Sequence, residues 1–158
     1  MEELLEYRQR MLNKLAEAPG LVETAVFNIK DQTQPLEAGG WNIHQVVAHM
    51  RDVNQHVYLL RLHRIIDEEN PMFENFDGEA WMAEHYQPLE PIRNLVSEFR
   101  EQCRSTADWL RSLPLEAWNL PGKHPSFGKH SLQWWVERTL AHISEHLAQL
   151  EQKEVSSQ

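Results

Sequence analysis

The sequence predicts an all-α protein, a four-helix bundle with an extra short helical segment and a loop-rich connection between the second and third long helices. Apolar residues recur at intervals of three and four in long segments, the spacing of an amphipathic helix. No segment alternates apolar and polar residues in the manner of a strand. The 158 residues fit one domain, expected over 1–153 and followed by a disordered tail over 154–158. Connections of short or medium length predict a bundle of antiparallel type.

The first long helix is predicted over residues 2–17, where charged residues separate the apolar ones. Its apolar stripe comprises Leu4, Leu5, Met11, Leu12 and Leu15. The dipeptide Pro19-Gly20 is a break signal, so this helix should end before it. Residues 21–30 are then expected to form the extra short helical segment, and the polar stretch "DQTQPLEAGG" should form a loop.

The second long helix begins within the sequence "GGWNIHQVVAHM", in which Asn42 is a candidate N-cap. We expect it to run to about Glu69, because Asn70-Pro71 is a stop signal. The aromatic-rich segment that follows, up to Pro91, is predicted to be a connection with one helical turn near its centre.

The third helix is predicted from Pro91 to Ser112, because a proline fits the first turn of a helix. The turn-rich segment "LPLEAWNLPGKHPSFGKHS" should be a loop. Ser131 is then a candidate cap for a fourth helix that extends to about Lys153.

Three residues on these helices carry specific expectations. Cys103 lies in the middle of the apolar stripe of the third helix, which predicts a buried small apolar residue rather than a nucleophile. Trp134 and Trp135 are adjacent on a helix and cannot both face the core. One of them should pack there, and the other should contact a loop or a dimer partner.

Composition excludes several classes of function. The net charge is −9, from 15 Lys and Arg against 24 Asp and Glu, and no basic cluster is present. This disfavours nucleic-acid partners. No apolar run has the length of a membrane span, and the N-terminus lacks the apolar core of a signal peptide. The single cysteine excludes an internal disulfide and suits a reducing compartment. These observations predict a cytoplasmic protein without membrane contact.

Two histidines in the sequence "LAHISEHLAQL" raise the question of a metal site. His142 and His146 are four residues apart, so they share one helix face at about 6 Å from each other. Imidazoles so placed can converge on one ion, with each nitrogen about 2.0–2.1 Å from zinc. From spacing alone, a metal pair and a pair of solvated histidines both remain open. A catalytic zinc ion also needs a third protein ligand.

The sequence "HISEH" matches H-x-x-E-H, the signature of inverted zinc proteases. That family takes a further carboxylate ligand from well downstream in the chain. Only 12 residues follow His146, and they have the composition of a helix end and a tail. The protease interpretation is therefore excluded.

A third ligand should come from another helix, and His49 is the best candidate because it lies beside the apolar residues Val46 and Val53. His56 and His63 lie on nearly the same stripe, but each is about 10.5 Å further along the axis. They either line the same cleft or mark a polar edge. The weaker candidates, at the helix start or in connections, are His44, His85, His124 and His130.

Two long stretches together resemble the DinB/YfiT-like superfamily of metal-dependent enzymes. These are "GGWNIHQVVAHMRDV" and, some 90 residues later, "HPSFGKHSLQWWVERTLAHISEHLAQL". The family pattern has a Trp-Ser/Asn helix start, a His with an Asp three residues on, an H-P-x-x-G loop, and H-x3-H before Leu-x-Gln. The matching residues are Trp41, Asn42, His49, Asp52, His124, Pro125, Gly128, His142, His146, Leu147 and Gln149. The resemblance spans nearly the whole chain.

This resemblance implies a four-helix bundle, often a homodimer, with a divalent ion such as zinc or nickel. Carried over to this chain, the implied ligands are His49, His142 and His146. Members of the superfamily include S-transferases and isomerases that use low-molecular-weight thiols, and others called hydrolases on the strength of the metal site alone. The resemblance therefore implies a small-molecule substrate, and a low-molecular-weight thiol is a candidate cofactor.

A three-histidine site leaves the ion positively charged with an open position, where the pKa of a water falls to about 7 and that of a thiol falls likewise. With thiolate bound, the protein would be a thiol S-transferase, which we expect. With hydroxide bound, it would be a hydrolase. A non-catalytic metal-binding or small-ligand-binding module is the third alternative.

Two carboxylates near the candidate ligands have two interpretations each. Glu145 could reach the rim of the site as a general base, or it could be an exposed surface residue. Asp52 could accept the free N–H of a ligand histidine in the second shell, or it could pair with a neighbouring arginine.

Overall fold

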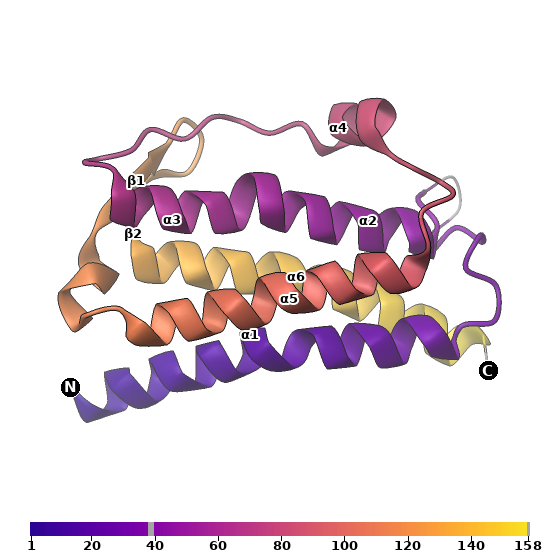
Figure 1. Cartoon of the computed structure of the whole chain (residues 1–158), viewed down its shortest axis with the longest axis horizontal. Coiled ribbons are helices and arrows are strands. Elements are labelled where there is room, and N and C mark those ends of the chain that lie inside the picture. The colour runs from indigo at the N-terminus through magenta and orange to yellow at the C-terminus, as the bar shows by residue number, and fades with distance from the viewer. Residues whose placement is uncertain (38–39, 158) are drawn as a thin grey trace.

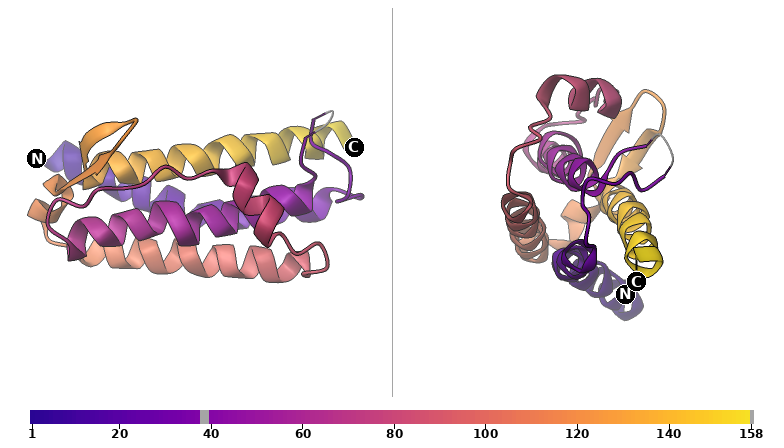
Figure 2. Two further views of the ribbon diagram at one scale, coloured as in Figure 1. Left: turned by 90° about the horizontal axis from the view of Figure 1, so that it is seen from above. Right: turned by 90° about the vertical axis from the view of Figure 1, so that its right-hand side faces the viewer.

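The structure, a computed structural model, describes residues 1–37 and 40–157. Four long helical segments lie side by side around one core, as Figures 1 and 2 show. They are α1 (Glu2–Asn28), the continuous segment of α2 (Ile43–Val53), η1 (Asn54–Tyr58) and α3 (Leu59–Asp67), α5 (Ile92–Ser112), and α6 (Leu132–Ser157). The predicted four-helix bundle is confirmed. Part of the loop predicted before the second helix, at 38–39, lies outside the described residues.

Helix α1 continues through Pro19 and Gly20, where the sequence predicts a break. The proline removes one backbone hydrogen bond, at a cost of about 3 kcal/mol. The buried face nevertheless continues beyond it, with Val22 and Val26 both 0% exposed. Burial of this second half against the rest of the bundle offsets the local cost. The prediction of a separate helical segment over 21–30 is therefore wrong.

The second long segment starts as predicted and contains one irregular turn. Asn42 caps α2 through a capping box with Gln45, whose side chain bonds back to the backbone N–H of Asn42. At η1 the helix widens into a single π-turn, the kind of insertion that is frequent at functional sites. The segment ends at Asp67, two residues before the predicted end.

Contacts between the long helices define their directions. Near the start of both α1 and α6, Tyr7 donates a hydrogen bond to Glu137, and near the end of both, Asn28 donates one to Glu154. These two helices are therefore parallel neighbours. The α2–α3 segment and α5 are also parallel. Arg51 pairs with Glu98 early in both segments, and His63 stacks on Trp109 near the end of both.

The bundle is thus of mixed type, and the expectation of antiparallel neighbours holds for α1 with α5 and for the α2–α3 segment with α6. The cause is the connection over residues 68–91, which returns along the length of the bundle before α5 begins (Figure 1). A long return lets α5 run in the same direction as the segment before it. This topology brings α2 and α6, far apart in sequence, into contact.

The connection contains α4 (Gly78–His85), an eight-residue helix at the position where one helical turn is predicted. Asp77 caps it by accepting a hydrogen bond from the backbone N–H of Ala80. The indole N–H of Trp81 donates to Asp52 on α2 at 3.0 Å. This bond attaches α4 to the outer side of the bundle, above α2 (Figure 2).

The segment between α5 and α6 is more regular than the predicted loop. It holds the 3-10 helix η2 (Leu115–Asn119) and a hairpin of β1 (Pro121–His124) and β2 (Gly128–Ser131). The strands have four residues each and mostly polar side chains, so no apolar alternation marks them. The turn requires Gly128, whose φ of 80° lies in the left-handed region.

Three predictions for single residues are confirmed. Cys103 is 0% exposed, and burial raises the pKa of its thiol to about 12. Trp135 is 1% exposed in the core, and its neighbour Trp134 stacks on His130 of the hairpin at 3.8 Å. Ser131 accepts a hydrogen bond from the backbone N–H of Trp134, as expected of a cap.

Helix α6 extends to Ser157, further than the end predicted near Lys153. The hydrogen bond between Asn28 and Glu154 links this last part of α6 to the end of α1. Residue 158, the end of the predicted tail, lies outside the described residues. Among the helices of the described chain, none has the length and apolar character that crossing a membrane requires.

Candidate metal centre

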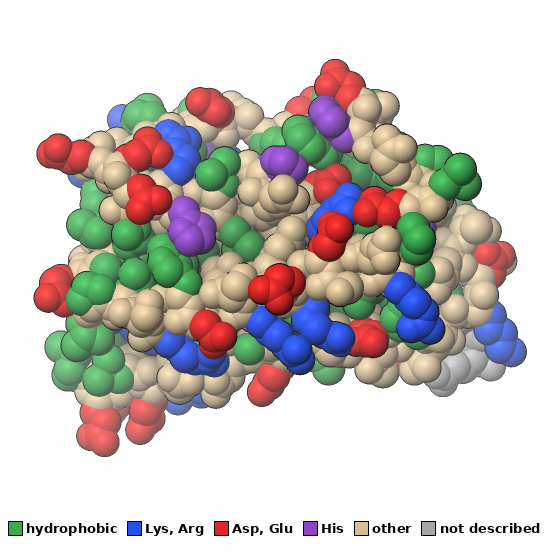
Figure 3. Space-filling view, viewed as in Figure 1, with side chains coloured by type: hydrophobic (Ala, Val, Ile, Leu, Met, Phe, Trp, Pro, Cys, Tyr) green, Lys and Arg blue, Asp and Glu red, His purple; other side chains and the backbone are tan. Residues whose placement is uncertain are grey.

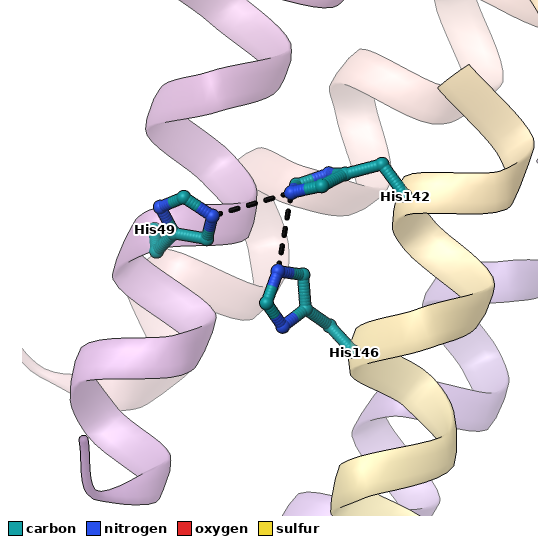
Figure 4. Close-up of side chains that lie close together, drawn as sticks. All are labelled: His49, His142 and His146. Atoms are coloured by element: carbon teal, nitrogen blue, oxygen red, sulfur yellow. Dashed lines mark hydrogen bonds between the residues drawn. The ribbon is translucent and has the colours of Figure 1, made fainter. Parts of the chain in front are cut away.

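Three histidine side chains from two helices point toward one another, as Figure 4 shows. His49 lies on α2, and His142 and His146 lie one turn apart on α6. Nε2 of His142 is 3.2 Å from Nε2 of His49 and 3.1 Å from Nε2 of His146. The fold therefore brings together the three residues that spacing and resemblance selected.

The arrangement fits a single metal ion. Ligand nitrogens about 2.0–2.1 Å from a tetrahedral ion lie about 3.3 Å from one another. The two Nε2–Nε2 distances, 3.1 and 3.2 Å, are close to that separation. All three ligand atoms lie within 4.8 Å of one another. These residues could hold a metal ion, with at least one coordination position left for a water or a substrate.

Packing holds the rings in place. The ring of His49 contacts Trp41 with centroids 4.9 Å apart, and the ring of His142 contacts Tyr58 at 4.8 Å. Gly78, at the start of α4, lies so close to His49 that an added Cβ would stand 3.2 Å from Cε1 of the imidazole. A larger residue at this position would press on the ring. The small residue thus lets α4 cover His49 closely.

The electrostatic environment keeps two ligands neutral. Burial lowers the pKa of His49 to about 4, with a further lowering from the nearby His146. Burial and both neighbouring imidazoles lower the pKa of His142 to about 3. Both rings are therefore unprotonated at neutral pH, which is the state that a metal ligand requires.

A hydrogen bond orients the third ligand. Nδ1 of His146 lies 2.9 Å from Oε1 of Gln149, on the same helix. Because an amide oxygen only accepts, Nδ1 carries the proton and Nε2 presents its lone pair to the centre. Gln149 belongs to the quoted family pattern, but the sequence reasoning assigned it no role. Its spacing of three from His146 was the available signal.

Asp52 has the second of its two predicted roles. It is 7% exposed, and its two carboxylate oxygens accept hydrogen bonds from Nε of Arg51 at 2.8 Å and from the indole of Trp81 at 3.0 Å. Within residues 1–37 and 40–157, we find no hydrogen bond from Asp52 to a ring of the triad. Asp52 pairs with a neighbouring arginine and anchors α4.

Glu145 is exposed and lies among none of the residues that line the hollows beside the triad, so the surface interpretation fits it better. The carboxylates that do line them are Glu37, Asp77 and Glu79, and the last, in the first turn of α4, borders two of the hollows. Glu79 borders one hollow with His146 and another with His49. The sequence reasoning missed Glu79, because only the return of the connection along the bundle brings it near the centre.

Three hollows border the triad, one of them the hollow that Glu79 shares with His49. A cavity of about 290 Å³ is bordered by His49 and His142, together with Tyr58, Arg61 and His124. We call it the arginine cavity. A second hollow of about 230 Å³ borders His146 and Gln149 and includes Trp41, Glu37 and Glu79. Each of the three histidines therefore borders open space.

The other histidines do not join the triad. His56, His63 and His85 are exposed. Figure 3 shows histidine side chains at the surface over α4 and the α2–α3 segment. His85 stacks on Trp81 and His63 stacks on Trp109, each with ring centroids 3.8 Å apart. Of the two possibilities for His56 and His63, the polar edge is the one that the structure shows.

Two further histidines make hydrogen bonds within the fold. His44 contacts the hydroxyl of Tyr86 and the carbonyl of Glu90, each at 2.6 Å. His124 is 4% exposed, and its Nδ1 accepts the backbone N–H of Ser126 at 3.0 Å. Although the sequence makes His124 only a weak candidate, the hairpin places it in the wall of the arginine cavity.

This chain is similar in sequence to several bacterial proteins that carry similar names. A protein of Oceanobacillus iheyensis is 28% identical over 142 residues, which cover 84% of this chain and 81% of that protein. The protein YfiT of Bacillus subtilis is 31% identical over 78 residues, 48% of this chain and 43% of YfiT. The names of both assign them provisionally to the metal-dependent hydrolases.

A solved structure of YfiT from Bacillus subtilis superposes with a TM-score of 0.87 at 22% identity, covering 96% of this chain and 87% of that one. It is described as having an unusual four-helix bundle topology, and the likeness shows that this chain has the same fold. The DinB superfamily matches residues 2–150, nearly the full length. Together with the fold, this match shows that the chain belongs to the DinB superfamily.

Proposed function

We propose that this protein holds a divalent ion, zinc or nickel, at His49, His142 and His146 and transfers a low-molecular-weight thiol to an electrophilic small molecule. The observation that carries the proposal is the convergence of three imidazole Nε2 atoms beside open space. A divalent ion at this point would lower the pKa of a thiol or a water and so supply a nucleophile near neutral pH.

The residues of the chain prepare the site for that ion. Burial keeps His49 and His142 neutral, and Gln149 directs the lone pair of His146 inward. The arginine cavity and the hollow beside His146 share no lining residue and leave room for two reactants next to the triad. Two such spaces support a reaction between two molecules, as S-transfer requires.

Hydrolysis is the second candidate, and two observations favour it. The relatives from Oceanobacillus iheyensis and Bacillus subtilis carry names of metal-dependent hydrolases. Glu79 also borders the hollows next to His49 and His146, where a carboxylate could accept a proton from an attacking water. The thiol reaction and the hydrolysis would use the same three ligands.

Metal content is the first test. Elemental mass spectrometry of protein purified without a histidine tag should find about one ion per chain. His49→Ala, His142→Ala and His146→Ala should each lose it, whereas His63→Ala, an exposed histidine outside the triad, should keep it. A wild-type protein that takes up no ion after incubation with zinc or nickel would contradict the proposal.

Turnover then separates the candidates. Zinc-loaded and nickel-loaded protein should conjugate cysteine or glutathione to 1-chloro-2,4-dinitrobenzene faster than the metal-free protein does. Hydrolysis of 4-nitrophenyl acetate without any thiol would favour the hydrolase instead. One bound ion with neither activity, over a panel of thiols, electrophiles and esters, would favour the non-catalytic module.

Two expectations from the resemblance and the composition stay predictions. The homodimer is checked by light scattering coupled to size-exclusion chromatography, which should give twice the chain mass of 18.6 kDa. The cytoplasmic location is checked by fractionation of the source cells, and a small molecule rather than a nucleic acid is the expected partner.

A further inference from the structure

The arginine cavity has a positively charged wall directly beside the histidine triad. Arg61 lines it together with His49 and His142. The residue is only 7% exposed, which is unusual for an arginine without a carboxylate partner. Such a buried charge is costly unless something compensates it, so the position of Arg61 needs an explanation.

Neutral groups orient this guanidinium. Nη2 of Arg61 donates to the backbone carbonyl of Glu74 at 2.8 Å. The guanidinium carbon lies 5.5 Å from the ring centroid of Phe73 and 5.7 Å from that of Trp135. Among the ion pairs of the described chain, none involves Arg61. The side chain is therefore held in place by neutral groups and makes no close ion pair, and the carboxylate of Glu74 acts on its charge only from a longer distance.

A second arginine adds to the same region. The guanidinium carbon of Arg138 lies 4.8 Å from the ring centroid of Phe127, which lines the cavity. Nε of Arg138 is buried and makes no hydrogen bond within the described residues. Arg138 also interacts with the hydroxyl of Tyr58, and both arginines act to lower the pKa of that phenol against the larger effect of burial.

The hollows around the triad thus differ in charge. The arginine cavity is lined by Arg61 and the hydroxyl-bearing Tyr58, and no Asp or Glu lines it. Arg138 contacts Phe127 and Tyr58 of its lining. The hollow beside His146 carries Glu37 and Glu79 instead. In a protein with a net charge of −9, a buried concentration of arginine marks a place for an anion.

We propose that the arginine cavity binds a carboxylate of the molecule that reacts at the metal centre, with Arg61 as its ion-pair partner and the Tyr58 hydroxyl as a further donor. This inference rests on the proposed function, because it assumes that a reactant meets the triad from this side. The carboxylate belongs to one of the two reactants, the thiol or the electrophile, and the same recognition would serve either.

The test compares carboxylates with their methyl esters. In the thiol arm, isothermal titration calorimetry of zinc-loaded protein compares 3-mercaptopropionate with methyl 3-mercaptopropionate. In the electrophile arm, the KM for 4-(bromomethyl)benzoate is compared with that for its methyl ester, with cysteine as the thiol. A preference for the acid of about ten-fold or more is expected in one arm, the size of a charge-assisted hydrogen bond. That arm identifies which reactant carries the carboxylate.

Variants assign the preference to Arg61. Arg61→Met should abolish it, and Arg64→Met should retain it, because Arg64 pairs with Glu68 and does not line the arginine cavity. If Arg61→Met does not fold, Arg61→Lys and Tyr58→Phe should each reduce the preference by a few-fold. An equal affinity for acid and ester in both arms of the wild type would overturn the proposal, as would an undiminished preference in the Arg61 and Tyr58 variants.

A metal-free measurement separates this inference from the proposed function. Propionate, which has no thiol, is titrated into chelator-treated protein, and its binding should be lost in Arg61→Met but kept in Arg64→Met. Arg61-dependent propionate binding in a protein that takes up no zinc would refute the metal site and leave the carboxylate site standing. One zinc ion per chain without Arg61-dependent binding of any carboxylate would support the metal site and refute the carboxylate site.

Discussion

Nδ1 of His146 lies 2.9 Å from Oε1 of Gln149, so the two side chains meet one turn apart on α6. The bond fixes which nitrogen of His146 carries the proton, and it turns the other nitrogen toward His142. Gln149 would thus orient the third ligand without itself binding the ion. Loss of such an outer partner typically lowers metal affinity by about 10–100-fold.

Replacement of this partner should weaken metal binding without removing a ligand. Gln149→Leu is expected to lower the affinity for zinc by about ten-fold, because the His146 ring loses its orienting acceptor. Gln149→Glu keeps an acceptor oxygen at the same position and should retain the affinity. Competition with a chromophoric chelator measures both. An affinity of Gln149→Leu equal to that of the wild type would show that the bond has no role in metal binding.

Acid should destabilise the metal-free fold. In the unfolded chain His49 binds its proton near pH 6.5, whereas in the folded protein its pKa is about 4. Between these values the unfolded state binds more protons, so the free energy of unfolding decreases as pH falls. The contribution is complete above pH 6.5 and is lost by about pH 4, with a size on the order of 3 kcal/mol.

Urea unfolding in the presence of a chelator, at pH 7.5 and at pH 4.5, measures this loss. His49→Gln has no titrating group at this position, so its stability should fall less between the two pH values. An equal decrease in the variant and the wild type would mean that other groups dominate the acid response.

Removal of the Asp52 carboxylate should affect stability rather than the metal. Asp52→Ala removes the acceptor of the Trp81 indole N–H and of the Arg51 Nε–H. The free energy of unfolding should fall by about 1–3 kcal/mol. Because the carboxylate makes no hydrogen bond to the triad in the described structure, the variant should still bind one ion per chain. Thermal unfolding and elemental analysis measure the two effects. Loss of the ion would mean that Asp52 does orient a ligand histidine.

The two candidate carboxylates should differ in turnover. Glu145→Gln removes an exposed charge and should leave kcat within about two-fold, since surface substitutions have small effects. Glu79→Gln should lower kcat by about ten-fold or more if that residue transfers a proton, a role that typically contributes 10²–10⁴-fold. Both variants should keep the ion. The opposite ranking would place the general base on α6 instead of α4.

The local pattern of the sequence was sufficient for most elements. Helix α5 lies within one residue of its predicted bounds, and the caps at Asn42 and Ser131 are present. Such features depend on nearest neighbours, because helix periodicity and capping involve residues within one or two turns. The break predicted at Pro19 was wrong because packing against distant helices outweighed a local signal.

The site shows the same division. Spacing along one helix pairs His142 with His146, and the position of His49 beside an apolar stripe, together with the family resemblance, adds the third ligand. Only the tertiary structure decided that α2 and α5 run parallel, that Asp52 holds Arg51 and Trp81, and that Glu79 and Arg61 line different hollows beside the triad. Those facts depend on the long return of residues 68–91 and on contacts between helices far apart in sequence, which no local periodicity encodes.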